Sequence, residues 1–271
     1  MSVERLMTLA ASCFGDRVWL IGGTQESAQL SVALSRFQLP CIVTVTTESA
    51  KALYPITQSL QIWVGRLDVT RLEEFLQEQG IVAILDASHP YAVEISKMAI
   101  AISLHRQIPY LRYERPAVDA EIDNNQQVIR LDSFETLLTG DYLQEQRVLL
   151  TIGYRNFPLF RPWQEKSTLF ARILPSVTAM DAAYAAGFAP DRLIALRPPV
   201  PAELEKALWH HWKISLVVTK ASGKAGGEDV KRRVATELGI PLVVITRPEV
   251  AYPQQTSDIE AAVEFCRYHL Q

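Results

Sequence analysis

Short apolar runs alternate with helix-patterned segments along most of this 271-residue chain. The first run stops at Gly22-Gly23, and residues 27–37 then carry apolar side chains at helical spacing. The expected strands are residues 18–21, 41–46, 62–64, 82–85, 128–131, 148–151, 169–173, 193–196 and 215–219. The expected helices are residues 27–37, 69–79, 134–145, 178–186, 202–212 and 257–270, the last capped by Ser257. Strands that are apolar on both faces and alternate with helices predict parallel sheets covered on both sides.

Two parts of the chain repeat the same order of signals. Residues 82–88 and 216–222 are each an apolar strand that ends in Ala-Ser. The later matching pairs are Ile108-Pro109 with Ile240-Pro241 and Arg115-Pro116 with Arg247-Pro248. Ordered matches of this kind favour a duplicated βαβ architecture.

A polar, acidic stretch at residues 119–127 marks the expected domain boundary. We therefore predict an N-terminal extension at 1–16, a first Rossmann-like domain at 17–118 that carries the cofactor turn, and a second at 119–271. The fold class is α/β with mainly parallel sheets. Because ligands of open α/β sheets bind at the carboxyl ends of the strands, a ligand cleft between the two domains is expected.

Composition excludes several classes of protein. Apolar residues make up 48% of the chain, enough for a sizeable core. A net charge of −3 argues against nucleic-acid binding, so any basic site must be local. The three cysteines are widely spaced, which predicts neither disulfides nor a metal site. No apolar run reaches membrane-span length, and the N-terminal stretch is a poor signal peptide, so a cytoplasmic protein is expected.

The turn after the first strand is the expected cofactor site. Gly22, Gly23 and Thr24 stand where a Rossmann fold places a dinucleotide's pyrophosphate, although the full G-x-G-x-x-G pattern is absent. The alternative is a tight turn whose glycines only allow close packing. Glu26 would repel a pyrophosphate, so we expect it to accept a ribose hydroxyl or to cap the helix.

The second strand ends at Thr46 and Thr47, followed by Glu48 and Lys51. The hydroxyls and the amine could accommodate the 2′-phosphate of NADPH, whereas Glu48 could serve NADH. The residues favour NADPH slightly. An ordinary helix start is the alternative interpretation.

Two further loops follow strands. One groups Asp86, Ser88, His89 and Tyr91, and the carboxylate and phenol beside His89 make a functional role for its imidazole more plausible than for a lone histidine.

The other loop, from Thr219 to Gly227, carries Lys220, Ser222 and Lys224. It is glycine-rich but lacks the phosphate-loop order, which disfavours nucleotide hydrolysis. Its backbone N–H groups and lysines suit a carboxylate-rich ligand. Lys231, Arg232 and Arg233 follow on the next helix, and as a cluster alone they are typical of a solvated basic face.

Over residues 17–248 the chain resembles the precorrin-6A and cobalt-precorrin-6A reductases of cobalamin biosynthesis. The motifs that carry the resemblance are Gly-Gly-Thr-x-Glu at 22–26, Gly-Arg-Leu-Asp at 65–68, Asp-Ala-Ser-His-Pro-Tyr-Ala at 86–92, Tyr-Leu-Arg-Tyr-Glu-Arg-Pro at 110–116, Thr-x-Gly at 151–153, Ala-Arg-Ile-Leu-Pro at 171–175, and Thr-Lys-x-Ser-Gly at 219–223 with Gly226-Gly227. The departures are the N-terminal extension and the residues around Gly153.

The resemblance implies an oxidoreductase. It reduces one carbon–carbon double bond of a corrin-precursor tetrapyrrole by hydride from NADPH or NADH. His89 or Tyr91 is the candidate proton donor, with bound water as a rival. Asp86 and Ser88 are grouped with the cofactor residues. The expected substrate-binding residues are Arg112, Arg115, Arg172, Lys220, Ser222 and Lys224.

Two other functions remain open at this point. One is a nicotinamide-dependent reductase of another polyanionic small molecule, and the other is a non-catalytic ligand-binding protein of two lobes. The residues do not decide the oligomeric state or whether the macrocycle carries cobalt.

Overall fold

The computed structural model describes residues 15–115 and 127–271 and divides into two compact units. Unit 1 comprises Met1–Arg115 and Glu249–Gln271, and unit 2 comprises Pro116–Pro248. Most of the predicted extension at 1–16, and the predicted boundary at 118–119, lie outside the described residues.

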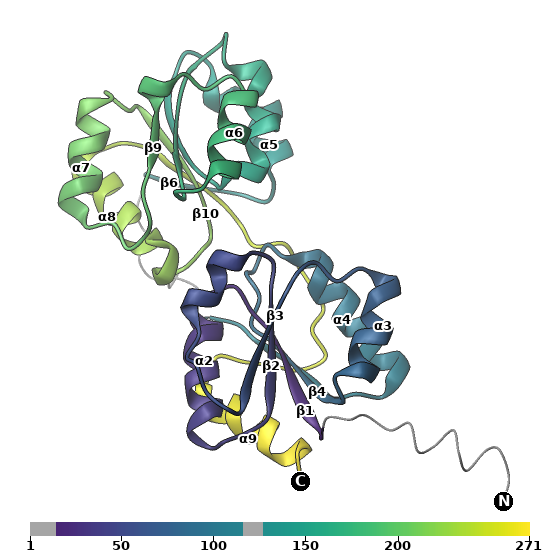
Figure 1. The fold of residues 1–271 in the computed structure, drawn as a ribbon. Helices are drawn as coiled ribbons and strands as arrows, with labels where there is room; N and C mark the ends of the chain where they lie inside the picture. Colours follow the sequence, from purple (N-terminus) through teal and green to yellow (C-terminus); the bar gives the residue numbers. More distant parts are fainter. Residues whose placement is uncertain (1–14, 116–126) are drawn as a thin grey trace, which may run out of the picture. The chain divides into compact units, whose positions relative to one another are not determined.

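Unit 1 contains a six-stranded parallel sheet in the order β12-β5-β4-β1-β2-β3. Its strands are β1 (Arg17–Ile21), β2 (Cys41–Val45), β3 (Leu60–Val64), β4 (Ile81–Asp86), β5 (Tyr110–Tyr113) and β12 (Gln255–Thr256). Its helices are α2 (Gln25–Arg36), η1 (Glu48–Leu53), α3 (Val69–Glu78), α4 (Val93–Arg106) and α9 (Ile259–His269). Apolar side chains of α2 and α9 pack on one face of the sheet, and those of α3 and α4 on the other (Figure 1).

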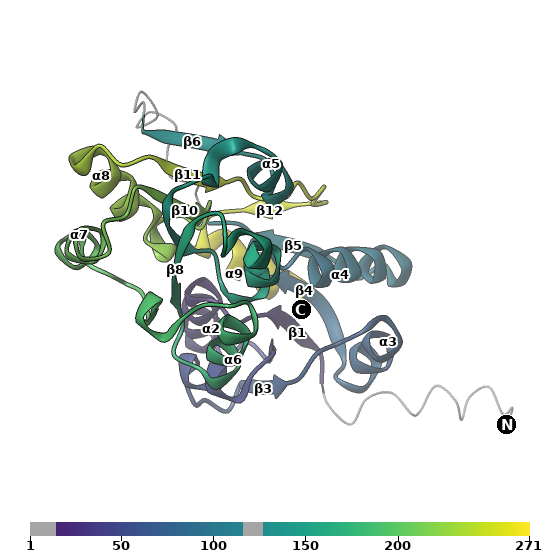
Figure 2. The same ribbon diagram turned by 90° about the horizontal axis from the view of Figure 1, so that it is seen from above.

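Unit 2 has its own six-stranded parallel sheet, in the order β6-β11-β10-β7-β8-β9. Its strands are β6 (Val128–Leu131), β7 (Arg147–Thr151), β8 (Thr168–Ile173), β9 (Leu193–Ala195), β10 (Leu216–Lys220) and β11 (Leu242–Ile245). Its helices are α5 (Phe134–Thr139), η3 (Asp141–Leu143), η4 (Tyr154–Trp163), α6 (Val177–Ala185), η5 (Pro190–Arg192), α7 (Ala202–His211), η6 (Lys224–Gly226) and α8 (Glu228–Leu238). Helices α5 and α6 cover one face, and α7 and α8 the other (Figure 2).

The predicted α/β class with two Rossmann-like sheets is confirmed. Five strands of each unit run in the same order, β5-β4-β1-β2-β3 in unit 1 and β11-β10-β7-β8-β9 in unit 2. The two repeated sequence segments lie on β4 and β10, which hold equivalent places. This agrees with a duplicated architecture.

The prediction that the second domain extends to residue 271 is wrong at its C-terminal end. Glu249–Gln271 belongs to unit 1, where β12 pairs with β5 and α9 packs beside α2. The sequence places this segment directly after unit 2, and chain order alone does not reveal the return. Asp258, and not Ser257, caps α9.

The helix expected at 134–145 ends at Thr139, since Gly140 adopts an extended conformation that cannot continue a helix. Among the helices of the described residues, none is long and apolar enough to span a membrane.

Candidate functional site

The first βα turn contains two glycines with different environments. A Cβ on Gly22 would overlap the Tyr54 hydroxyl and lie 2.7 Å from Cγ1 of Val43, so this position requires glycine for close packing. Gly23 has φ +98°, and a Cβ there would meet nothing within 4 Å. The turn therefore packs tightly at Gly22 and is open at Gly23, where a ligand could approach the backbone.

Thr24 and Tyr54 fix the shape of the turn. Thr24 caps α2 by accepting a hydrogen bond from the Ser27 N–H at 3.0 Å, and its hydroxyl donates to the Ala87 carbonyl at 2.8 Å. The Tyr54 hydroxyl accepts from the Gly23 N–H at 2.6 Å, and burial raises its pKa. Sequence reasoning missed Tyr54, because no local pattern links a residue after η1 to this turn.

Glu26 does not cap the helix, which corrects one of the two roles expected of it. Its carboxylate pairs with Nη1 of Arg115 at 3.0 Å, and both side chains are largely buried. Arg115, expected at the substrate, thus lies at the start of α2. The pair neutralises the carboxylate that seemed incompatible with a nearby pyrophosphate.

The end of β2 is more open. Thr46, Thr47 and Lys51 are exposed, and Lys51 pairs with Glu48 at 2.8 Å. Because β2 is the parallel neighbour of β1, these groups lie at the same edge of the sheet as Gly23.

Asp86 is the centre of a buried network, and this burial argues against its predicted contact with the cofactor. Its side chain is fully buried and accepts hydrogen bonds from the Ser88 N–H at 2.9 Å and Nη1 of Arg112 at 2.9 Å. The hydroxyls of Ser96 and Tyr110 donate to its other oxygen at 2.6 and 2.7 Å. Asp86 therefore holds the beginning of the loop that carries His89.

Arg112 is likewise internal, and its burial does not support its expected role as a substrate clamp. Its side chain is 1% exposed, donates to Glu114 at 2.8 Å and Ser88 Oγ at 3.0 Å, and lies 5.2 Å from the ring centre of Tyr252. Ser88, itself buried, is an acceptor inside this network. Apart from Glu114, the partners are 24 or more residues from Arg112 in sequence or come from the C-terminal segment, so the sequence alone did not reveal them.

His89 and Tyr91 lie beyond this network. His89 is exposed, and its Nδ1 accepts from the Tyr91 N–H at 3.3 Å, with the rings 5.7 Å apart. Parallel strands β1 and β4 pair with Ile21 opposite Asp86, and the Thr24–Ala87 hydrogen bond joins the two loops that follow. Gly23 and His89 are therefore brought to one edge of the unit 1 sheet.

In unit 2 the glycine-rich loop is closed on itself. The Gly223 N–H donates to a carboxylate oxygen of Glu228 at 2.9 Å, and the N–H groups of Gly226 and Gly227 donate to carbonyls of the same loop. These amides are engaged within the chain, so the expected binding of an anion by the loop backbone is not supported.

The predicted site residues at the carboxyl end of β10 differ in their exposure. Lys224 is exposed, whereas Ser222 is buried so closely that a Cβ on Gly226 would overlap it. Burial and the nearby Arg155 lower the pKa of Lys220 to about 8. Arg155 was not predicted as a site residue.

Arg172 is buried and pairs with Glu205, which does not support its expected role as a substrate clamp. Lys231 and Arg232 are also buried, which corrects the expectation of a solvated basic face.

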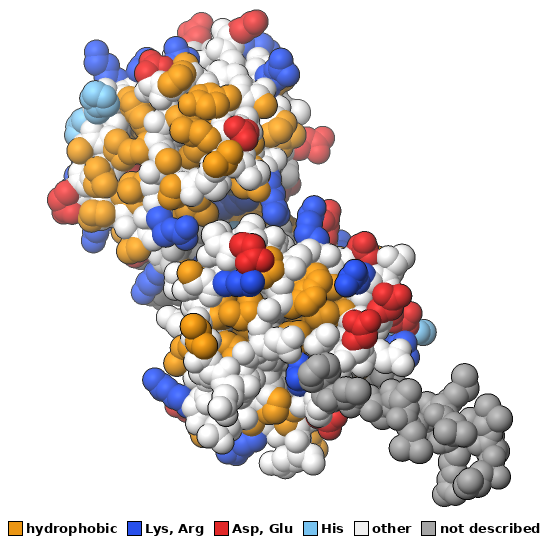
Figure 3. Space-filling view, viewed as in Figure 1, with side chains coloured by type: hydrophobic (Ala, Val, Ile, Leu, Met, Phe, Trp, Pro, Cys, Tyr) orange, Lys and Arg blue, Asp and Glu red, His pale blue; other side chains and the backbone are white. Residues whose placement is uncertain are grey.

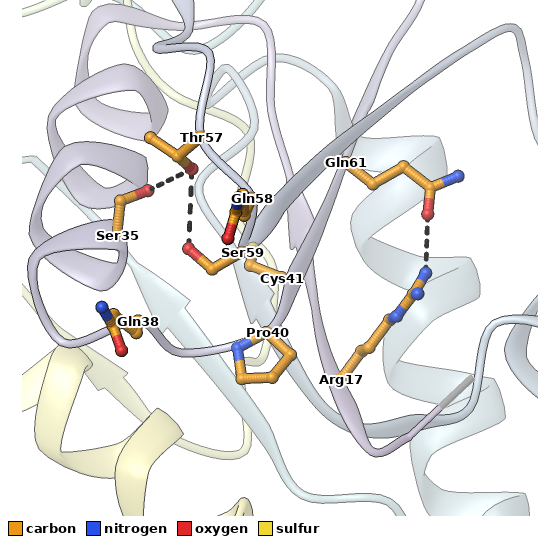
Figure 4. A pocket seen from close by; sticks show the side chains of 9 residues that line it. All are labelled: Arg17, Ser35, Gln38, Pro40, Cys41, Thr57, Gln58, Ser59 and Gln61. Atoms are coloured by element: carbon orange, nitrogen blue, oxygen red, sulfur yellow. Dashed lines mark hydrogen bonds between the residues drawn. The ribbon is translucent and has the colours of Figure 1, made fainter.

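One cavity of about 530 Å³ lies at the amino ends of β1, β2 and β3 (Figure 4). It is lined by polar side chains, among them Arg17, whose Nη1 donates to Gln61 at 2.6 Å. This is the opposite end of the sheet from the loops above, so we do not assign it to the cofactor. Within the described residues, no group of three His, Cys, Asp or Glu side chains is placed to hold a metal ion.

Comparison with known proteins decides the family. The family model described as precorrin-6x reductase CbiJ/CobK matches residues 17–267. The chain belongs to this family. Precorrin-6x reductases similar to it include a cobalt-precorrin-6A reductase of Synechocystis sp., 47% identical over 93% of this chain and 97% of the relative. Another, from Priestia megaterium, is 31% identical over 91% of this chain and 96% of the relative.

A solved structure titled CobK precorrin-6A reductase superposes with a TM-score of 0.75, at 22% identity over 94% of this chain and 97% of that one. It supports the fold. The resemblance drawn from the motifs is thus confirmed, and so is the class of enzyme, a reductase of a carbon–carbon double bond.

Proposed function

We propose that this precorrin-6x reductase reduces cobalt-precorrin-6A, using NADPH as the hydride donor. The observation that carries the choice of substrate is the 47% identity, over nearly the whole of both chains, to a cobalt-precorrin-6A reductase. The step adds a hydride to one carbon of a double bond and a proton to its neighbour.

Unit 1 fits the dinucleotide. NADPH, when bound, supplies the hydride. The pyrophosphate would lie against the open side of Gly23 at the positive end of α2, although the Gly23 N–H itself donates to Tyr54. The Glu26–Arg115 ion pair offsets the charge that would repel it. Thr46, Thr47 and Lys51 would contact the 2′-phosphate.

The same edge of unit 1 carries the candidate proton donor. His89 is exposed on a loop whose preceding residues are held by Asp86, and an imidazolium is an effective donor near neutral pH. Tyr91 and bound water are the alternatives. The variant His89→Ala tests whether His89 is the donor. Loss of the proton donor lowers kcat by about 10²–10⁴-fold, whereas loss of a group that only positions the substrate raises KM.

Unit 2 offers positive charge for the carboxylates of the macrocycle. The chain as a whole is negative, and on the face shown in Figure 3 acidic and basic side chains are interspersed. Attraction must therefore come from local groups. Lys220, at the end of β10, and exposed Lys224 supply them, with Arg155 near Lys220.

Removing these two charges tests the assignment. Lys220→Gln with Lys224→Gln is expected to raise KM for the macrocycle and to flatten its dependence on ionic strength, because fewer screened charge pairs remain. The Kd for NADPH should stay unchanged. The matched control, Lys97→Gln with Lys213→Gln, removes two exposed charges elsewhere. If the test variant instead no longer binds NADPH but still binds NADH, these lysines contact the 2′-phosphate, and the assignment of the cofactor to unit 1 is wrong.

A further inference from the structure

Unit 2 buries a cluster of charged side chains beneath its glycine-rich loop. Each is at most 8% exposed, and together they come from β8, α7 and α8. The members of this buried charge cluster are Arg172, Glu205, Glu228, Lys231 and Arg232. Arg172 pairs with Glu205, which also accepts from the Trp209 indole at 3.1 Å.

Lys231 connects the cluster to the loop. Its side chain is 1% exposed, and its ammonium donates to the carbonyls of Gly226 at 2.8 Å and Gly227 at 3.1 Å. Gly227 has φ +67°, a conformation that few residues other than glycine adopt readily. The ammonium thus holds this turn by its backbone carbonyls.

Glu228 holds the other end of the same loop. One of its oxygens accepts from the Gly223 N–H at 2.9 Å, and the other accepts from Nε and Nη2 of Arg232 at 3.0 and 2.8 Å. Residues 223–227 are therefore anchored at both ends by opposite charges that α8 supplies.

Stability alone does not account for this arrangement. Burying an ion costs several kcal/mol of desolvation, and apolar replacements of buried ion pairs are often neutral or stabilising. The cluster instead fixes the path of a loop in which the amides of Gly223, Gly226 and Gly227 are engaged internally. Exposed Lys224 lies within that loop, and Lys220 ends β10, three residues before Gly223.

We propose that Lys231 is a positioning residue for substrate binding: its buried ammonium, together with Glu228, holds residues 223–227 so that Lys220 and Lys224 present their charges to the carboxylates of the macrocycle. This rests on the proposed function, in which those two lysines contact the substrate.

The test uses Lys231→Met in the full-length enzyme, with Arg233→Met as the matched control, because Arg233 is exposed on the same helix. Hydrogen exchange of the amides of residues 223–228 is measured without ligands. We expect at least tenfold faster exchange in Lys231→Met and no change in Arg233→Met. In Lys231→Met the KM for the macrocycle should rise about tenfold, while kcat and the affinity for NADPH stay unchanged. Glu228→Gln should also speed exchange, and it replaces Lys231→Met if that variant fails to fold.

The outcomes separate the two proposals. Unchanged exchange in the loop of the folded variants overturns the positioning role of Lys231, whatever the value of KM. Faster exchange with an unchanged KM supports the hold on the loop but overturns its link to substrate. The proposed contacts of Lys220 and Lys224 are then judged separately, by the variant Lys220→Gln with Lys224→Gln.

Discussion

Gly22 and Gly23 are adjacent in the chain, yet each is a glycine for a different reason. Gly22 is closely packed against Val43 and Tyr54, whereas Gly23 faces open space with a positive φ. The sequence presents packing and ligand approach as alternatives for the turn. The structure shows the packing at Gly22, and the open side of Gly23 leaves ligand approach there as a prediction.

Alanine at each glycine should therefore have different effects. Gly22→Ala is expected to lower the free energy of unfolding by about 1–3 kcal/mol, because overpacking forces Tyr54 or Val43 to move. Gly23→Ala should lower the free energy of unfolding by about 1 kcal/mol, because alanine is strained at a positive φ. It should also weaken the binding of NADPH, since the new methyl group occupies the approach to the turn. Chemical denaturation and fluorescence titration measure the two effects. A Gly23→Ala protein with unchanged NADPH affinity would move the pyrophosphate elsewhere.

Lys231 should also produce a pH dependence of stability. Burial and the charge of Arg172 lower the pKa of Lys231 to about 8. The carboxylates of Glu205, Glu228 and Asp229 oppose this shift but do not cancel it. Its pKa in the unfolded chain is near 10.4, so between about pH 8 and 10 the unfolded chain binds more protons and stability rises with pH.

The matching measurement compares wild type with Lys231→Met. The difference in free energy of unfolding between them should shift in favour of wild type from pH 7 to pH 9.5, by at most about 1.4 kcal/mol per pH unit. Lys220, whose pKa is also lowered, is present in both proteins and cancels. A difference that stays constant with pH would mean that Lys231 titrates normally.

At the scale of elements, the C-terminal segment completes unit 1. Strand β12 extends its sheet beside β5, and α9 buries Ala262, Val263 and Cys266 in the same core as Val18. The segment also places Tyr252 over Arg112 in the Asp86 network. Unit 1 is thus built from both ends of the chain, whereas unit 2 is one continuous stretch.

Truncation after Pro248 should therefore unfold unit 1 and leave unit 2 folded. Loss of α9 uncovers apolar core of unit 1, while unit 2 keeps its own two apolar clusters. Scanning calorimetry should show loss of one transition, together with loss of NADPH binding. A control that lacks only Gln271 should retain both calorimetric transitions and NADPH binding. If the truncated chain keeps both transitions, α9 is not part of the core that stabilises unit 1.

For the whole molecule, local patterns determined the elements, the α/β class and the family. Apolar runs, glycine turns and the motif at residues 86–92 depend on neighbouring residues, so they can be read along the chain. The candidate loops were found in this way, and they follow strands in both sheets. The exposed positions of His89 and Lys224 are compatible with the roles proposed for them.

Only the tertiary structure decided which charged side chains are available to a ligand. Asp86 and Arg112 are 26 residues apart, and Arg172 and Glu205 are 33 apart, yet each pair is buried together. The membership of α9 in unit 1 was decided in the same way. Burial and pairing depend on contacts between distant segments, and a charged residue within a motif has the same sequence signal whether it binds substrate or supports a loop from within.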